Sequence, residues 1–194
     1  DVLLGQKASL IAVLAIIVLA IGSVSLIDKR TQGLNVGEID DLTAADHFQQ
    51  GILAIHNRHT PDVIMHRNAL EQLGGSAEQV RLLKAFTQAM ADDVQGAAES
   101  IQELEDTTDE TIRTYIYYIA GEMAMRQKNY PVAVGYLQTA IELGENLEPP
   151  CLPAYQLMAS LHFDQGNMQH AMDAANRVAE IAPDFTLLLP ASDG

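Results

Sequence analysis

Apolar residues recur along most of this chain at the spacing of amphipathic helices, and short polar stretches separate these runs. Capping residues and prolines mark three helix starts, at Thr43 with Asp46, at Ser76 with Gln79 and at Thr60 with Pro61. Gly74-Gly75 indicates a helix end. The pattern predicts helices near 44–57, 61–73, 77–91, 94–105, 110–127, 131–143, 153–165 and 168–181.

The predicted helices form pairs that share a repeated arrangement of small residues. Ala97, Ala133 and Ala171 each lie early in the second helix of a pair, 36 and 38 residues apart. Repeats of this length are typical of stacked helical hairpins, which present surface for binding rather than catalytic chemistry. An ordinary up-and-down helical bundle is the alternative, because periodicity alone does not separate the two architectures.

Two of these pairs carry further matching positions. The middle pair has Tyr117, Ala120, Gly121 and Ala124 in its first helix, with Ala133, Leu137 and Ala140 in its second. The last pair has Tyr155, Met158, Ala159 and His162, then Ala171, Ala175, Val178 and Pro183. Here the chain resembles the tetratricopeptide repeat (TPR) family, whose period is about 34 residues. Tyr or no aromatic residue stands where that family has Trp, and 147–150 lengthens the spacing.

This resemblance implies a TPR-like α-solenoid of helical hairpins. For the whole chain we expect an all-α fold, with one N-terminal transmembrane helix followed by this solenoid. We expect five regions: a tail and membrane anchor at 1–27, a linker at 28–43, a degenerate hairpin at 44–75, three TPR-like repeats at 76–185 and a tail at 186–194. The apolar segment 185–189 would either fold back over the last hairpin or bind a partner.

The membrane anchor is predicted from residues 8–27, which contain no charged side chain. A helix of this length spans about 30 Å, the thickness of the hydrocarbon core of a bilayer. The alternative is a cleaved signal peptide, whose apolar core is usually shorter, about 7–15 residues. We therefore expect a retained single span that contacts the lipid bilayer through residues 8–27.

The side of the membrane on which the large domain lies stays open. Lys29 and Arg30 outnumber Lys7, which by the positive-inside rule places the domain in the cytoplasm. Residues preceding Asp1 would alter that count. Similar layouts occur in bacterial inner-membrane proteins, so we expect the bacterial inner membrane, with a lean toward the periplasm.

Composition narrows the class of partner. The formal net charge is −15, apolar residues make up 48% of the chain and aromatic residues only 5%. A strongly acidic surface does not suit nucleic acids, which are held mainly through phosphate contacts to Lys and Arg. We expect protein partners, a membrane complex among them, and no nucleic acid. Cys151 is the only cysteine, and we predict that it packs in the core.

Candidate chemistry is limited to three histidines, His56, His59 and His66, which lie around one predicted turn. Imidazoles at such spacing can converge on a transition metal, but Arg58 lies between them, and we favour surface histidines on a turn. Without a phosphate-binding glycine loop, a nucleophile elbow or a haem-attachment motif, the sequence predicts no enzyme and no cofactor.

The predicted binding site is the groove that first helices line in the resembled family. Its apolar, aromatic and methionine side chains suit an extended or helical apolar segment of a partner. Mapped on this chain, its positions are Leu82, Phe86, Met90, Tyr115, Tyr118, Glu122, Met125, Arg126, Gln156, Ser160 and Phe163. We expect a membrane-anchored scaffold or assembly factor. The alternative is a constitutive accessory subunit of a larger membrane complex, held by its transmembrane helix.

Overall fold

The computed structural model describes residues 42–148 and 150–181, and its regular structure in these ranges is entirely helical. The helices are α3 (Ala44–His56), α4 (Thr60–Gln72), α5 (Ala77–Met90), α6 (Val94–Gln102), α7 (Glu110–Arg126), α8 (Tyr130–Gly144), α9 (Leu152–Asp164) and α10 (Met168–Ile181). The all-α class is confirmed, and the predicted helix bounds agree to within three residues. In the described ranges no helix is long and apolar enough to cross a bilayer. The predicted span 8–27, most of the linker and the tail lie outside them.

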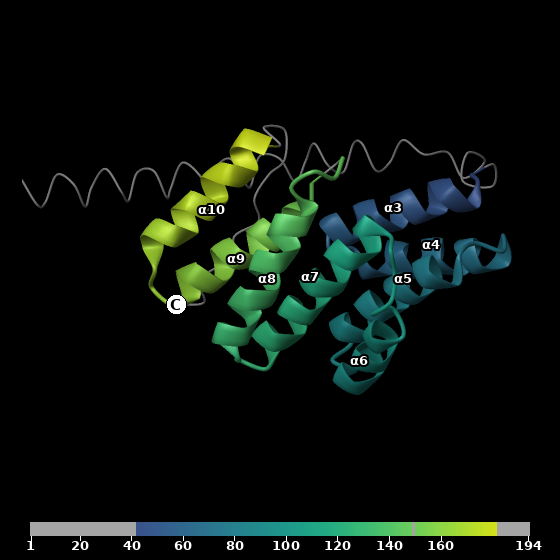
Figure 1. Ribbon diagram of the computed structural model, residues 1–194, viewed down its shortest axis with the longest axis horizontal. Coiled ribbons are helices and arrows are strands. Elements are labelled where there is room, and N and C mark those ends of the chain that lie inside the picture. Colours follow the sequence, from purple (N-terminus) through teal and green to yellow (C-terminus); the bar gives the residue numbers. More distant parts are fainter. Residues whose placement is uncertain (1–41, 149, 182–194) are drawn as a thin grey trace, which may run out of the picture.

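Consecutive helices pair into four antiparallel hairpins, α3–α4, α5–α6, α7–α8 and α9–α10 (Figure 1). Each hairpin turns through a residue with positive φ. These residues are Arg58 (54°), Asp92 (60°), Lys128 (59°) and Gly166 (74°), and they are 34, 36 and 38 residues apart. The next residue always donates its amide to the carbonyl five positions earlier: His59 to Ala54, Asp93 to Gln88, Asn129 to Ala124 and Asn167 to His162. The four hairpins therefore repeat one backbone turn, of the kind that closes helices with a left-handed residue.

Packing positions repeat in register with these turns. Seven residues before the left-handed position stand Gly51, Ala85, Gly121 and Ala159, and five residues after it stand Val63, Ala97, Ala133 and Ala171, all buried. A Cβ placed on Gly121 would lie 2.8 Å from Cδ2 of Leu137, so α7 and α8 cross where only glycine fits. The predicted alignment of the three alanines is confirmed. The first hairpin, expected to be degenerate, shares the same register.

The hairpins stack in a solenoid-like row, with α3–α4 near one end and α10 at the other (Figure 1). Within hairpins, α7 packs most extensively on α8 and α9 on α10. Helix α3 contacts α4 and α5, and it also reaches α9. One hydrophobic core therefore runs from α3 to α9, and a smaller cluster of Leu152, Tyr155 and Val178 joins α9 to α10.

The capping differs from the prediction at two of the three helix starts. Thr43 and Asp46 form the expected capping box at α3. Ser76 precedes α5 as predicted, but its side chain makes no capping hydrogen bond. Thr60 lies inside α4, whose N-cap is His59, because Pro61 is accommodated anywhere in the first helical turn.

Candidate partner-binding site

The predicted groove residues separate into a buried set and a partly exposed set. The buried set, called the floor here, consists of Leu82, Phe86, Tyr115, Tyr118, Glu122 and Ser160, each at most 8% exposed. The partly exposed set, called the rim, consists of Met90, Met125, Arg126, Gln156 and Phe163. Four rim residues lie at the turn ends of α5, α7 and α9, and Gln156 lies nearer the start of α9. Of the predicted groove residues, only those of the rim expose side-chain surface to a partner in this conformation.

The floor is packed as an aromatic core. Phe86 of α5 and Tyr118 of α7 are stacked with ring centroids 6.5 Å apart. Tyr115 meets Tyr118 edge to face at 6.2 Å. His56, at the end of α3, stacks on Tyr115 and hydrogen-bonds its hydroxyl through Nε2. The end of the first hairpin therefore packs against the floor at Tyr115.

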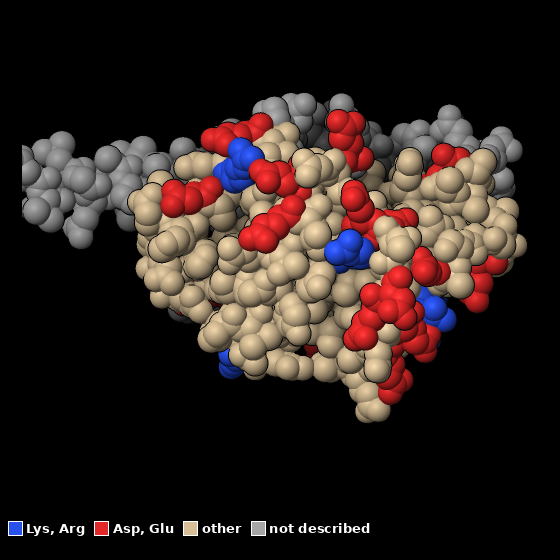
Figure 2. All heavy atoms as spheres, in the orientation of Figure 1, with Lys and Arg blue, Asp and Glu red and all other residues tan. Residues whose placement is uncertain are grey.

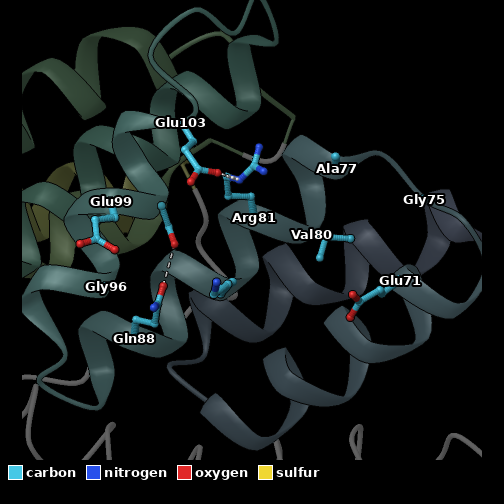
Figure 3. Close-up of a pocket in the computed structure, with 11 residues that line it drawn as sticks. Glu71, Gly75, Ala77, Val80, Arg81, Gln88, Gly96, Glu99 and Glu103 are labelled. Atoms are coloured by element: carbon cyan, nitrogen blue, oxygen red, sulfur yellow. Dashed lines mark hydrogen bonds and ion pairs between the residues drawn. The ribbon is translucent and has the colours of Figure 1, made fainter.

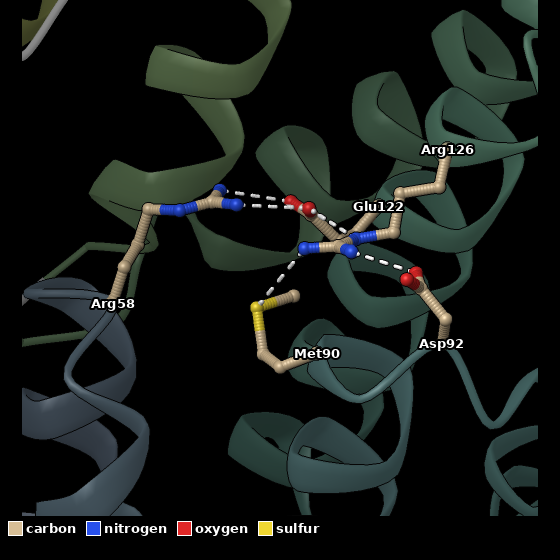
Figure 4. Close-up of polar contacts among 5 residues, drawn as sticks. All are labelled: Arg58, Met90, Asp92, Glu122 and Arg126. Atoms are coloured by element: carbon tan, nitrogen blue, oxygen red, sulfur yellow. Dashed lines mark hydrogen bonds and ion pairs between the residues drawn. The ribbon is translucent and has the colours of Figure 1, made fainter.

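A second connection runs through four charged residues from three hairpins, called the ion-pair network here (Figure 4). The two guanidinium nitrogens Nη1 and Nη2 of Arg58 each donate to one carboxylate oxygen of Glu122, both at 2.8 Å. Arg126 donates through Nε to Glu122 at 3.0 Å and through Nη1 to Asp92 at 2.8 Å. The Glu122 side chain is only 5% exposed, so the two arginines compensate a buried charge.

Burial keeps the two tyrosines of the floor, and the neighbouring Cys151 and His56, uncharged at neutral pH. Burial raises the pKa of Tyr118, and the neighbouring Glu122 carboxylate raises it further. Burial likewise raises the pKa of Tyr115 and brings the pKa of Cys151 to about 12. Cys151 is fully buried, as predicted for a packing residue. Burial lowers the pKa of His56 to about 4, so this ring is neutral beside Tyr115.

The three histidines of the first turn point to different partners. His56 contacts Tyr115, His59 contacts Asp62 at 2.8 Å, and His66 contacts His47. Our prediction that they lie on the surface is wrong for His56 and His66, which are 3% and 7% exposed because the helices of the hairpin pack around them. Among the described residues, no group of three or more His, Cys, Asp or Glu side chains could hold a metal ion.

A polar hollow of about 460 Å³ lies on another side of the molecule, between the end of α4, α5 and α6 (Figure 3). Arg81 pairs with Glu103 at 2.6 Å across it, and Ser100 donates to Gln88 at 2.8 Å. Lys84 and Glu99 also line it. Sequence reasoning did not predict this hollow, because its residues come from three helices and belong to no recognisable motif.

Apolar side chains are also exposed outside the predicted groove. Those on the later hairpins are Val132 and Tyr136 of α8 and Met168 and Met172 of α10, each 40–47% exposed. Acidic side chains gather near α5 and α6, whereas the lower part of α8 lies in a wide uncharged area (Figure 2). Residues 129–141 contain no charged side chain.

The residues that sequence reasoning missed are Arg58 and Asp92, which connect hairpins, and His47, which contacts His66 within the first hairpin. Two of them occupy or adjoin turns, where the sequence shows only polar residues. The comparisons with protein-family models, with curated proteins and with solved structures found no match for this chain.

Proposed function

We propose that this protein is a membrane-anchored scaffold or assembly factor that binds an apolar segment of a partner protein at the groove. The observation that supports it is the rim. Met90, Met125 and Phe163 keep partly exposed side chains at the turn ends of three successive first helices. Methionine and aromatic side chains adapt to apolar partner segments of varied shape.

The charge around the rim favours a particular kind of segment. Nη2 of Arg126 lies 3.6 Å from the Met90 sulfur, so the apolar rim adjoins the ion-pair network. Asp92, whose side chain is 75% exposed, adds a carboxylate on the solvent side. A segment with an apolar centre and a flanking cation would complement both, and the flanking charge would mainly affect the association rate.

The experiment is a pull-down from detergent extracts with a double variant of the rim, Met125→Ala/Phe163→Ala. Interfaces concentrate their energy in a few apolar anchors, so each truncation should weaken binding by about 1–3 kcal/mol. The matched control is Val132→Ala/Tyr136→Ala, which removes comparable exposed surface from α8. Normal partner recovery by a folded rim variant would place the binding surface elsewhere.

The second candidate function is a constitutive accessory subunit of a membrane complex. The uncharged segment 8–27 supports it, since a spanning helix at this position could hold the chain within such a complex. Extraction of the native complex in detergent and mass spectrometry separate the two functions. A subunit is recovered at fixed stoichiometry, whereas an assembly factor is recovered in varying, substoichiometric amounts.

A further inference from the structure

The first hairpin, α3–α4, contains three buried histidines, and two of them face each other. Nδ1 of His47 lies 3.0 Å from Nδ1 of His66, and these residues are only 4% and 7% exposed. A hydrogen bond between two imidazole nitrogens needs one N–H donor and one lone pair. The ring that supplies the lone pair cannot take up a proton there while the contact exists. The His47–His66 contact therefore excludes the doubly protonated pair.

The third buried histidine connects this hairpin to the rest of the molecule. His56 is 3% exposed and bonds Tyr115 of α7. Burial holds the pKa of His56 near 4, and burial together with His47 lowers the pKa of His66. Both rings would regain ordinary basicity, with a pKa near 6.5, if the hairpin separated from α7 and its own helices loosened.

Other charged groups near these rings offset the lowered pKa of His66 only in part. Asp46 of α3 interacts with His47, and Asp62 of α4 interacts with His66 and opposes the lowering of its pKa. From α5, Leu83 packs against Gly51 of the hairpin, and the Thr87 hydroxyl accepts a hydrogen bond from Arg67.

On the side of α7 and α9, the facing groups are neutral or already paired. Tyr115 of α7 faces His56, and Cys151, just before α9, lies near Tyr115; burial keeps both Tyr115 and Cys151 uncharged at neutral pH. Glu122 of α7 is paired with Arg58 and Arg126. No described contact thus gives His56 a carboxylate partner that would stabilise its charged form.

We propose that the α3–α4 hairpin is a proton-sensitive cover over the floor, closed while its buried histidines are neutral and opened by their protonation. Opening would uncover Tyr115, Tyr118 and Glu122. The purpose of this opening rests on the proposed function. The opening itself rests on the histidine contacts alone. The closed state is fully favoured above pH 6.5 and is progressively lost as the pH falls toward 4. At pH 5, His56 alone should shift the closed-to-open ratio by about 30-fold toward the open state.

The test is hydrogen exchange of the purified full chain at pH 7.5 and pH 5.0, corrected for the pH dependence of chemical exchange. We expect the amides of α3 and α4 to lose protection by about 30-fold, while those of α8 lose less than about threefold. Equal loss of protection in all helices would overturn the proposal, because it would show general acid destabilisation. Unchanged protection of α3 and α4 would overturn it as well.

Variants with amide side chains identify the responsible rings. The Asn Nδ2 and Oδ1 atoms approximate the position of imidazole Nδ1, and the Gln amide approximates Nε2, so His47→Asn/His56→Gln keeps hydrogen-bonding groups but does not titrate. We expect this variant to lose most of the pH response. The control is His59→Asn, since the His59 side chain is 58% exposed and should leave the response unchanged.

His56→Gln alone serves if the double variant does not fold, and it should reduce the loss of protection at pH 5 by at least about tenfold. A folded variant that still opens like the wild type would contradict the proposal. Partner recovery by the rim variant is measured separately. If the hairpin opens at acidic pH but the protein recovers no partner, the proposed function is rejected and the proton-sensitive cover is retained.

Discussion

The first and third hairpins share one backbone turn but use its left-handed residue differently. Arg58 and Lys128 have φ values of 54° and 59° and the same surrounding hydrogen bonds. The Arg58 side chain crosses to Glu122 of the third hairpin, whereas the Lys128 side chain is exposed. Equivalent turns thus give repeated hairpins, and the side chains on them decide which hairpins are joined.

The two hairpins carry different residues at equivalent positions. Six residues before the turn residue, the first hairpin has Ile52 where the third has Glu122. Ten residues before it, Phe48 corresponds to Tyr118. The third hairpin therefore offers a hydroxyl and a carboxylate where the first is apolar. Arg58 reaches that carboxylate from the end of the first hairpin.

The largest predicted effect follows from the floor of the third hairpin. Tyr118 is fully buried, so Tyr118→Ala should lower the free energy of unfolding by about 3–5 kcal/mol through the cavity that it leaves. Tyr136→Ala in the same hairpin removes a ring that is 40% exposed and should cost less than about 1 kcal/mol. Urea denaturation measures both. Similar values for the two variants would show that the floor is not a packed core.

The different roles of Arg58 and Lys128 can be tested by replacing each residue with glycine. Arg58→Gly and Lys128→Gly both relieve a positive φ, which by itself should stabilise by up to about 1 kcal/mol. Arg58→Gly also leaves the buried Glu122 with one arginine, and should have a net cost of about 2 kcal/mol after allowance for the 39% exposure of the Arg58 side chain. Thermal or urea unfolding should therefore separate two variants with the same backbone change. Equal stability of the two variants would show that the Arg58 side chain contributes no more than the Lys128 side chain.

The pH dependence of the unfolding free energy should also come from the first hairpin. Because the folded-state pKa of His56 is about 4, below the ordinary value of 6.5, its contribution is complete above pH 6.5 and is lost as the pH falls through 4. Between pH 7 and pH 5 this loss is about 2 kcal/mol of unfolding free energy. His56→Gln should flatten that part of the profile in urea titrations. A variant profile as steep as the wild type would assign the dependence to other groups.

The last two substitutions compare a buried and an exposed position of α8, and the exposed one gives the smallest effect. Ala133 is fully buried, so Ala133→Leu should overpack the crossing and cost roughly 1–3 kcal/mol. Gly135 lies two residues further on the exposed side of α8, and a Cβ there would meet no atom within 4 Å. Gly135→Ala should therefore stabilise by about 0.5–1 kcal/mol. Opposite signs in thermal unfolding are the expected result, and equal signs would contradict the assigned helix faces.

The sequence predicted what local physics determines. Helix bounds, the capping box at Thr43 and the register of Ala97, Ala133 and Ala171 follow from periodicity, capping and the steric needs of close crossings. Membership of the TPR family, the membrane anchor and the partner stay predictions.

The state of the groove could not be predicted from the sequence. The first hairpin reaches it through a contact between residues 58 and 122, which are 64 positions apart. A polar residue such as Arg58 in a turn gives no sign of its distant partner. The histidines were predicted to lie on the surface for the same reason, since their burial results from packing between helices.

A double-mutant cycle between Arg58 and Glu122 tests most directly whether this pair fastens the first hairpin over the floor. Arg58→Met keeps an apolar stem and removes the guanidinium, and Glu122→Gln keeps the side-chain shape and removes the charge. We predict a coupling free energy of at least about 1 kcal/mol in urea unfolding, compared with less than about 0.5 kcal/mol for the more exposed Arg126–Asp92 pair. A coupling between Arg58 and Glu122 that is indistinguishable from zero would contradict the account.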